Sequence, residues 1–219
     1  MADVIIFGVL DTAELAHFYL ENDSEHNVVA FAVNREYITE NSFKGLPVVA
    51  FEEIEQVFPP SDFSFFAPMT ARNMNRNREK VYLEAKQKGY SFISYISSRA
   101  TVYDKSLIGE NCFILEDNTI QPFTTIGNNV VLWSGNHIGH HGRIDDHVFF
   151  TSHVVLSGHC HVHPYCFFGV NSTIKDYTNI AQGTLLGMAS SLNKDSEEWG
   201  IYVGVPAKRV PGKLSYEAY

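Results

Sequence analysis

A period of six residues runs through the second half of the chain and limits its fold more than any other feature. Every sixth residue from Ile96 to Leu186 is apolar. A strand alternates every two residues and an α-helix turns about every 3.6, so an unbroken period of six indicates a repeating unit rather than one element. The apolar positions are Ile96, Val102, Ile108, Ile114, Ile120, Ile126, Leu132, Ile138, Ile144, Phe150, Leu156, Val162, Phe168, Ile174, Ile180 and Leu186.

A second register, four residues after each apolar position, holds mostly small side chains. One large and one small inward residue per six is what a three-sided prism of short strands requires, because a strand alternates its faces and each corner uses further residues. Three hexads make one coil, so residues 18 apart stack. We therefore predict a parallel β-helix of about five coils from about Ile96 to Leu186. The second register reads Ala100, Ser106, Cys112, Asn118, Thr124, Val130, Asn136, Gly142, Val148, Val154, Cys160, Cys166, Ser172, Thr178, Thr184 and Ser190.

The first ninety or so residues follow a different pattern. Apolar segments at 4–8 and 28–33 predict strands, and the helical periodicity at 12–20 predicts a helix between them. Further strands are expected at 47–49 and 63–66, and a helix at 75–88. We predict an α/β, Rossmann-like domain over residues 1–94, the β-helix over 95–190, and a loop with a C-terminal tail over 191–219.

The composition argues against nucleic-acid and membrane partners. The formal net charge is −9, and no basic patch is visible that would attract an anionic surface. The apolar start at residues 4–10 is too short to cross a bilayer. Three cysteines without a CxxC spacing, and no signal-peptide pattern, fit a reducing compartment. The sequence therefore predicts a cytoplasmic protein, without membrane insertion, whose partners are small molecules or other protein chains.

Three short motifs accompany the repeats: residues 75–78 (NRNR) before the predicted helix, residues 138–141 (IGHH) within the repeats, and residues 203–209 (VGVPAKR) after them. With these motifs the chain resembles, over essentially its whole length, the bacterial sialic-acid O-acetyltransferases and nucleotide-amino-sugar N-acetyltransferases. The resemblance implies a left-handed β-helix and a homotrimer. It also implies active sites between neighbouring β-helices, with acetyl-CoA as the co-substrate.

The resemblance implies that His140 is the catalytic histidine. Acyl transfer from a thioester needs a base that takes the proton of the attacking amine or hydroxyl, and imidazole is such a base near neutral pH. In the family a backbone N–H one coil further on stabilises the oxyanion, and Gly158 stacks 18 residues after His140. The family's acidic residue after the histidine is replaced here by His141. The group that orients the ring is therefore open among His141, Asp145, Asp146, a backbone carbonyl and a group of the adjacent chain.

The same resemblance suggests the binding residues. In the first strand–helix turn only Gly8 remains of the family's glycine-rich phosphate loop. Lys208 and Arg209 could pair with the phosphates of CoA. Candidate contacts to the acceptor sugar nucleotide are Trp133, Asn136, His137, Asn34, Arg35, Asn73 and Arg76. Candidate contacts to CoA are Gly158, Gly169, Val170, Met188, Ala189, Gly204, Pro206, Lys208 and Arg209.

The sequence thus predicts an acetyl-CoA-dependent N-acetyltransferase acting on a nucleotide-linked amino sugar, a 4-amino-4,6-dideoxyhexose of surface polysaccharide biosynthesis. One alternative is O-acetylation of a sugar or sialic acid, since one base serves both reactions. Another is a metal-dependent β-helix, because histidines crowd residues 137–163. These histidines lie mostly at outward positions of the six-residue repeat, with no carboxylate or cysteine to complete a ligand set, so no metal is expected. The cysteines occupy the small inward register and are expected to pack as small apolar residues.

Overall fold

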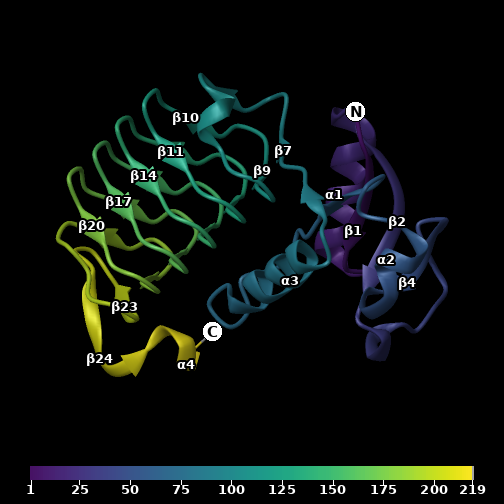
Figure 1. Ribbon diagram of the computed structural model, residues 1–219. Helices are drawn as coiled ribbons and strands as arrows, with labels where there is room; N and C mark the ends of the chain where they lie inside the picture. Colours follow the sequence, from purple (N-terminus) through teal and green to yellow (C-terminus); the bar gives the residue numbers. More distant parts are fainter. Residues whose placement is uncertain (219) are drawn as a thin grey trace.

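The computed structural model describes residues 1–218 (Figure 1). A six-stranded sheet forms the N-terminal part, in the order β3-β4-β2-β1-β5-β6. Its strands pair in parallel except for the hairpin of β3 and β4. The central strand β1 is almost fully buried, as expected for a parallel sheet covered on both faces. The strands are β1 (Asp3–Phe7), β2 (Asn27–Val33), β3 (Ser42–Phe43), β4 (Leu46–Ala50), β5 (Ser64–Phe66) and β6 (Ser91–Phe92).

Helices cover both faces of this sheet. Helix α1 (Asp11–Asp23) packs Ala13, Ala16 and Leu20 into one core cluster. Helix α3 (Arg76–Gln87) and the short α2 (Ile54–Val57) contribute to a separate cluster with the other face. The predicted strands and helices are present, and α1 extends beyond the predicted 12–20 at both ends. Three short 3-10 helices lie at Arg35–Tyr37, Phe51–Glu53 and Lys105–Leu107.

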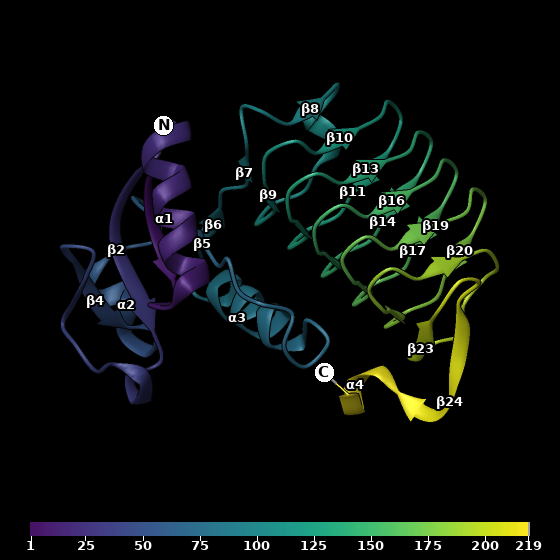
Figure 2. The ribbon, with the colours of Figure 1, turned by 180° about the vertical axis from the view of Figure 1, so that it is seen from behind.

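The repeats form a parallel β-helix whose strands are mostly two residues long (Figure 2). Stacked strands pair 18 residues apart, as Val131 does with Phe113 and Phe149. One sheet holds β8 (Thr101–Val102), β10 (Thr119–Ile120), β13 (His137–Ile138), β16 (Val155–Leu156), β19 (Thr173–Ile174) and β22 (Ser191–Leu192). A four-stranded sheet holds β11 (Thr125–Ile126), β14 (Arg143–Ile144), β17 (His161–Val162) and β20 (Asn179–Ile180).

The third sheet of the β-helix has eight strands. They are β7 (Tyr95–Ile96), β9 (Phe113–Ile114), β12 (Val131–Leu132), β15 (Phe149–Phe150), β18 (Phe167–Phe168), β21 (Leu185–Leu186), β23 (Gly200–Val203) and β24 (Lys208–Leu214). The apolar register from Ile114 to Leu186 is buried inside the prism, while Ile96, Val102 and Ile108 at its first coils are partly exposed. The register therefore predicted the β-helix core correctly.

The two parts share one core. The outer face of the eight-stranded sheet presents Phe113, Phe149 and Phe167, which belong to the same apolar cluster as α1. At the end of α1, Asp23 accepts hydrogen bonds from Tyr95 Oη (2.6 Å) and the Ser98 backbone N–H (2.9 Å). Burial opposes ionisation of this carboxyl, but its bonds to Ser98, Tyr95 and Ser97 prevail and lower its pKa to about 2.

The cysteines confirm the expectation from the small inward register. Cys112, Cys160 and Cys166 are buried and unpaired. Burial raises the pKa of Cys112 to about 11 and that of Cys166 to about 12, and it also raises the pKa of Cys160. All three remain protonated thiols at neutral pH, which makes them poor nucleophiles.

The C-terminal segment holds more structure than a loop. β22 continues the coils past residue 190, because Ser191 pairs with Thr173. β23 then joins the eight-stranded sheet, and β24 pairs with it in antiparallel fashion. The chain ends in α4 (Ser215–Ala218) near the start of α3 (Figures 1 and 2), where Arg76 lies over the Trp199 ring at 4.6 Å. Within residues 1–218, none of the helices has both the length and the hydropathy of a membrane span.

Candidate active site

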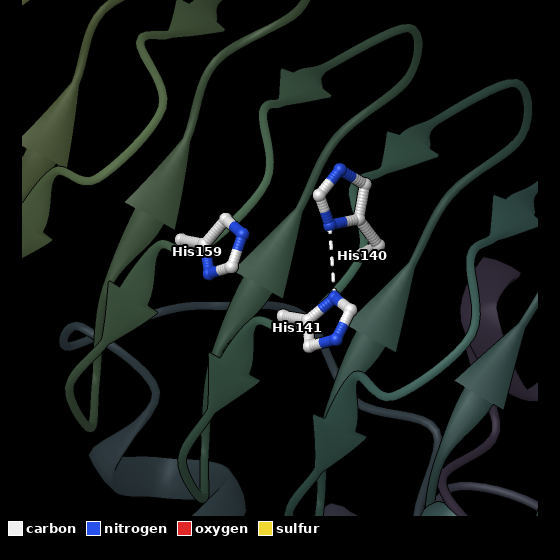
Figure 3. Close-up of side chains that lie close together, drawn as sticks. All are labelled: His140, His141 and His159. Atoms are coloured by element: carbon white, nitrogen blue, oxygen red, sulfur yellow. Dashed lines mark hydrogen bonds between the residues drawn. The ribbon is translucent and has the colours of Figure 1, made fainter.

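His140 and His141 lie side by side on one corner of the prism, between β13 and β14. We call the stacked turns at residues 121–124, 139–142, 157–160 and 175–178 the histidine corner. Both side chains are exposed, and their Nδ1 atoms lie 3.0 Å apart (Figure 3). One ring must donate this hydrogen bond and the other accept it. If His140 donates through Nδ1, its Nε2 carries a lone pair, which is the form a general base needs.

Gly158 packs against the His140 ring, as the 18-residue spacing predicts. A Cβ added to Gly158 would lie 3.0 Å from His140 Cε1 and 3.1 Å from its Nε2. Only glycine leaves the ring in its present place without a shift of a few tenths of an ångström. The Nε2 edge of His140 thus faces the backbone of the next coil.

The Gly158 backbone N–H has no acceptor among the described residues. One coil earlier, the His140 N–H donates to Gln121 Oε1 at 3.1 Å. Gly139 lies relative to Gly158 as Gln121 lies relative to His140. It has no side chain that could accept a hydrogen bond from the Gly158 N–H. A Cβ added to Gly139 would lie 2.5 Å from the Gly158 nitrogen. Two glycines therefore leave a free donor beside the base, which is the arrangement an oxyanion requires.

His141 also belongs to a column of stacked rings on the histidine corner. Its ring lies 4.7 Å from that of Phe123 and 5.1 Å from that of His159, and the His159 ring stacks on Tyr177 at 4.5 Å. The column fixes the plane of His141 and therefore the direction of its Nδ1. Ring nitrogens of His140, His141 and His159 also lie within 4.8 Å of one another, which is close enough for a transition metal.

The two acidic candidates for orienting His140 are engaged elsewhere. Asp145 accepts hydrogen bonds from Arg143 Nε (2.6 Å) and from His161 (2.9 Å). Asp146 accepts from the Asn128 N–H at 2.7 Å. Both residues follow β14 and so lie across the four-stranded sheet from the histidine corner. The prediction of an orienting role for Asp145 and Asp146 is not supported within one chain, and His141 is the residue in contact.

Asn136 faces the interior rather than a substrate. It is 1% exposed, its Oδ1 accepts from the Val154 N–H at 2.8 Å, and its Nδ2 donates to the Trp133 carbonyl. The prediction of a substrate contact is wrong here, because position 136 belongs to the small inward register, where a side-chain amide satisfies backbone groups of the coil. His137 is outward on β13 and half-buried.

Trp133 lies on a different corner from His140. It follows β12 of the eight-stranded sheet and packs against the core shared with α1. We call the stacked turns at 133–136, 151–154, 169–172 and 187–190 the glycine corner. Trp133, a predicted contact to the acceptor sugar nucleotide, therefore does not flank His140 within one chain.

The glycine corner also collects the predicted CoA contacts. A Cβ added to Gly169 would lie 2.5 Å from the Met188 nitrogen. The Ala189 N–H donates to the Val170 carbonyl at 2.8 Å. Met188 is 77% exposed and Val170 41%, so the corner presents an apolar surface.

The C-terminal tail reaches the same corner. Gly204 N–H donates to Ser190 Oγ at 3.0 Å, and the Val205–Pro206 peptide bond is cis. Lys208 is exposed, while Arg209 Nε lies 3.3 Å from a Glu197 carboxylate oxygen. Of the two predicted phosphate contacts, only Lys208 is without a carboxylate partner in the described part of the chain.

The predicted N-terminal contacts do not form one cluster. Asn34 Nδ2 and the Arg35 N–H both donate to the Glu52 carboxylate, and the Arg35 guanidinium pairs with Glu53 at 2.7 Å. Asn73 donates to the side chain of Asn77 at 3.3 Å. The guanidinium group of Arg76 lies over the Trp199 ring.

A cavity of about 510 Å³ lies beside Asn34, at the carboxyl ends of the parallel strands. Among its lining residues are Glu52, Glu55 and Lys88, and Lys88 Nζ lies 2.8 Å from a Glu55 oxygen. Ligands of open parallel sheets bind at this edge. The carboxylates suit hydroxyl and amino groups better than phosphates.

Sequence reasoning did not identify Gln121 and Gly139. Gln121 takes up the His140 N–H, and Gly139 leaves the Gly158 N–H free. Both lie one coil before the residues that they affect. The 18-residue spacing that located Gly158 could also have located these two positions.

The model of the bacterial transferase hexapeptide family (six repeats) matches residues 105–140. A mutant perosamine N-acetyltransferase from Caulobacter crescentus, solved with CoA and GDP-perosamine, superposes with a TM-score of 0.85 at 22% identity, covering 96% of this chain and 97% of that one. The acetyltransferase domain of PglB from Neisseria gonorrhoeae gives 0.82 at 20% identity, with 96% and 100% covered. This chain is a hexapeptide-repeat protein with the left-handed β-helix fold of these acetyltransferases.

Curated relatives match only part of the chain. The acyl-[acyl-carrier-protein]–UDP-N-acetylglucosamine O-acyltransferase of Sinorhizobium fredii is 27% identical over 107 residues, which are 46% of this chain and 40% of that enzyme. The chain thus spans about two fifths of the length of this relative. The structural neighbours, in contrast, extend over both the N-terminal part and the hexapeptide repeats.

Proposed function

We propose that this hexapeptide-repeat protein is an acetyl-CoA-dependent N-acetyltransferase acting on a nucleotide-linked amino sugar, a 4-amino-4,6-dideoxyhexose of surface polysaccharide biosynthesis. The observation that carries the proposal is the free Gly158 N–H beside the Nε2 edge of His140. A base and an oxyanion donor on neighbouring coils are the two groups that acyl transfer from a thioester needs.

The residues perform the reaction in a simple order. The acceptor amine attacks the thioester carbonyl while His140 Nε2 takes its proton, and the Gly158 N–H donates to the developing oxyanion. When the C–S bond breaks, the protonated His140 returns the proton to the departing thiolate. His141 accepts from His140 Nδ1 throughout and keeps the ring in the required tautomer. No acyl-enzyme is needed, in keeping with three buried, protonated cysteines.

The glycine corner fits the arm of CoA. Exposed Met188 and Val170 offer apolar contact, Gly169 lets the coil that carries Met188 stack closely, and Lys208 can bind a phosphate. In one chain, however, this corner and the histidine corner are different edges of the prism. We therefore infer a homotrimer in which the histidine corner of one chain faces the glycine corner of the next.

We infer that the N-terminal sheet is a Rossmann-like domain that holds the sugar nucleotide. Its parallel strands end beside the cavity at Asn34, at the edge where such sheets bind ligands. The Caulobacter enzyme, which superposes over both parts, was solved with CoA and GDP-perosamine. Glu52 occupies the Asn34 and Arg35 donors, so we expect phosphate binding to depend on other groups.

O-acetylation is the second candidate, and the matched O-acyltransferases of UDP-N-acetylglucosamine favour it. The test is a screen of acetyl-CoA consumption against dTDP-, UDP- and GDP-linked 4-amino sugars, with free sialic acid as hydroxyl acceptor. We expect turnover with at least one amino sugar and an amide in the product. Turnover with sialic acid alone, or an ester product, would replace the proposal with O-acetylation.

A further inference from the structure

Asp145, His161 and His163 form a second cluster on the four-stranded sheet, so a carboxylate does lie beside two of the histidines, contrary to the expectation from the sequence. His161 begins β17, and His163 lies two residues later on the same outward side. Asp145 precedes His163 by 18 residues and therefore lies directly beneath it on the previous coil. Asp145 Oδ2 is 2.9 Å from His161 Nε2 and 3.7 Å from His163 Nδ1, and one ligand atom from each residue lies within 4.8 Å of the others.

The hydrogen bond of His163 to Asn179 places two hydrogen-bond acceptors, His163 Nδ1 and the Asp145 carboxylate, opposite each other. His163 Nε2 lies 3.0 Å from Asn179 Oδ1, an oxygen that can only accept, so Nε2 carries a proton. In the neutral ring Nδ1 then holds a lone pair, and this lone pair faces the Asp145 carboxylate. Two acceptors in such positions are stabilised by a cation between them.

The local charges allow such a cation and also limit its affinity. Burial opposes ionisation of Asp145, but hydrogen bonds from Arg143 and His161 outweigh it and hold the pKa of this carboxyl below its usual range. Arg143 Nε binds Oδ1 at 2.6 Å and leaves Oδ2 to the imidazoles. The Arg143 side chain is 66% exposed and can move into solvent, yet its charge opposes a neighbouring metal ion.

We propose that Asp145 Oδ2, His161 Nε2 and His163 Nδ1 bind one divalent transition-metal ion of the Zn²⁺, Co²⁺ and Ni²⁺ class. Two imidazoles and a carboxylate suit these ions, and Asn179 holds the His163 tautomer as an outer-shell partner. Binding displaces the proton of His161 Nε2 to solvent or to Nδ1. The ion would join two successive coils and is independent of the acetyl-transfer chemistry.

The test uses the full-length protein after chelator treatment and dialysis, titrated with Co²⁺ by calorimetry and by visible absorption. We expect one equivalent per chain in the wild type. His163→Gln and Asp145→Asn should abolish it, and Asn179→Ala should weaken it by about 10-fold. Arg143→Gln should tighten it, because it removes the opposing charge.

The histidine corner supplies the control, since His140, His141 and His159 could also take a metal ion. His159→Phe should leave the stoichiometry and affinity unchanged. Loss of binding in His159→Phe but not in His163→Gln would overturn the proposal, as would a wild-type protein that binds no Co²⁺. Circular dichroism shows whether each variant is folded. If Asp145→Asn does not fold, the loss of binding in folded His163→Gln and the weaker binding in Asn179→Ala still decide the proposal.

Discussion

Replacing His141 with phenylalanine tests whether this residue positions the base. The substitution removes the Nδ1 atom 3.0 Å from His140 Nδ1 and keeps a ring between Phe123 and His159. The backbone accepts the change, because Phe123 and Tyr177 already adopt the same positive φ at equivalent places in the column, near 67° and 58°. The variant therefore removes one hydrogen bond while retaining the stack.

The expected loss follows from that single bond. A hydrogen bond between partly exposed groups contributes roughly 0.5–1.5 kcal/mol, and about 1.4 kcal/mol changes a rate tenfold. If the bond holds His140 in the reactive tautomer and orientation, kcat should fall roughly 2- to 13-fold in His141→Phe. KM for acetyl-CoA should change little, because the substitution keeps an aromatic ring in the stack and alters none of the residues proposed to contact CoA.

The assay follows release of CoA thiol at saturating acetyl-CoA and an accepted amino sugar. His159→Phe is the matched control, since it alters the same column one coil away. The backbone hydrogen bond from the His159 N–H to the His140 carbonyl is kept, and no hydrogen bond joins the two side chains within the described residues. Equal rates for His141→Phe and His159→Phe, or a His141→Phe rate within error of the wild type, would refute the positioning role.

Three further predictions concern the base pocket, the link between the two parts and a buried cation. Gly158→Ala should lower kcat about 10-fold or more with the fold intact, since the new Cβ meets the His140 ring at 3.0 Å; an unchanged steady-state rate would contradict this. Asp23→Asn should lower the melting temperature at neutral pH. Its folded pKa of about 2 lies below the unfolded value, so the difference from wild type should vanish as pH falls from about 4 to about 2 in thermal scans. Arg78→Met should lower the free energy of unfolding, measured in urea, by on the order of 3 kcal/mol, because fully buried Arg78 donates to the Asn129 carbonyl and side chain. A decrease below about 1 kcal/mol, the size of one ordinary hydrogen bond, would show that these contacts are weak.

The hexapeptide register predicted the fold because burial alone determines it. A side chain every six residues must point inward, so the sequence located the prism core, the buried cysteines and the stacking of Gly158 on His140. Asn136 shows the strength of the register over the resemblance. Its place in the inward register indicates a buried amide, which the structure confirms, whereas the family resemblance had suggested a substrate contact.

Contacts between distant segments could not be predicted in this way. Arg76, at the start of α3, contacts Trp199 near the other end of the chain. Such pairs depend on how side chains extend over the surface, and a local pattern carries no information about this. The direction of Trp133 likewise depends on the core that the β-helix shares with α1, which periodicity within the repeats cannot show.

The most direct test of the central claim is the turnover of His140→Asn with acetyl-CoA and an accepted nucleotide-linked amino sugar, beside light scattering of the same sample. We predict a kcat lower by about 10²-fold or more, with the mass still three times that of one chain. A rate close to wild type in an intact oligomer would show that His140 is not the base and would contradict the account.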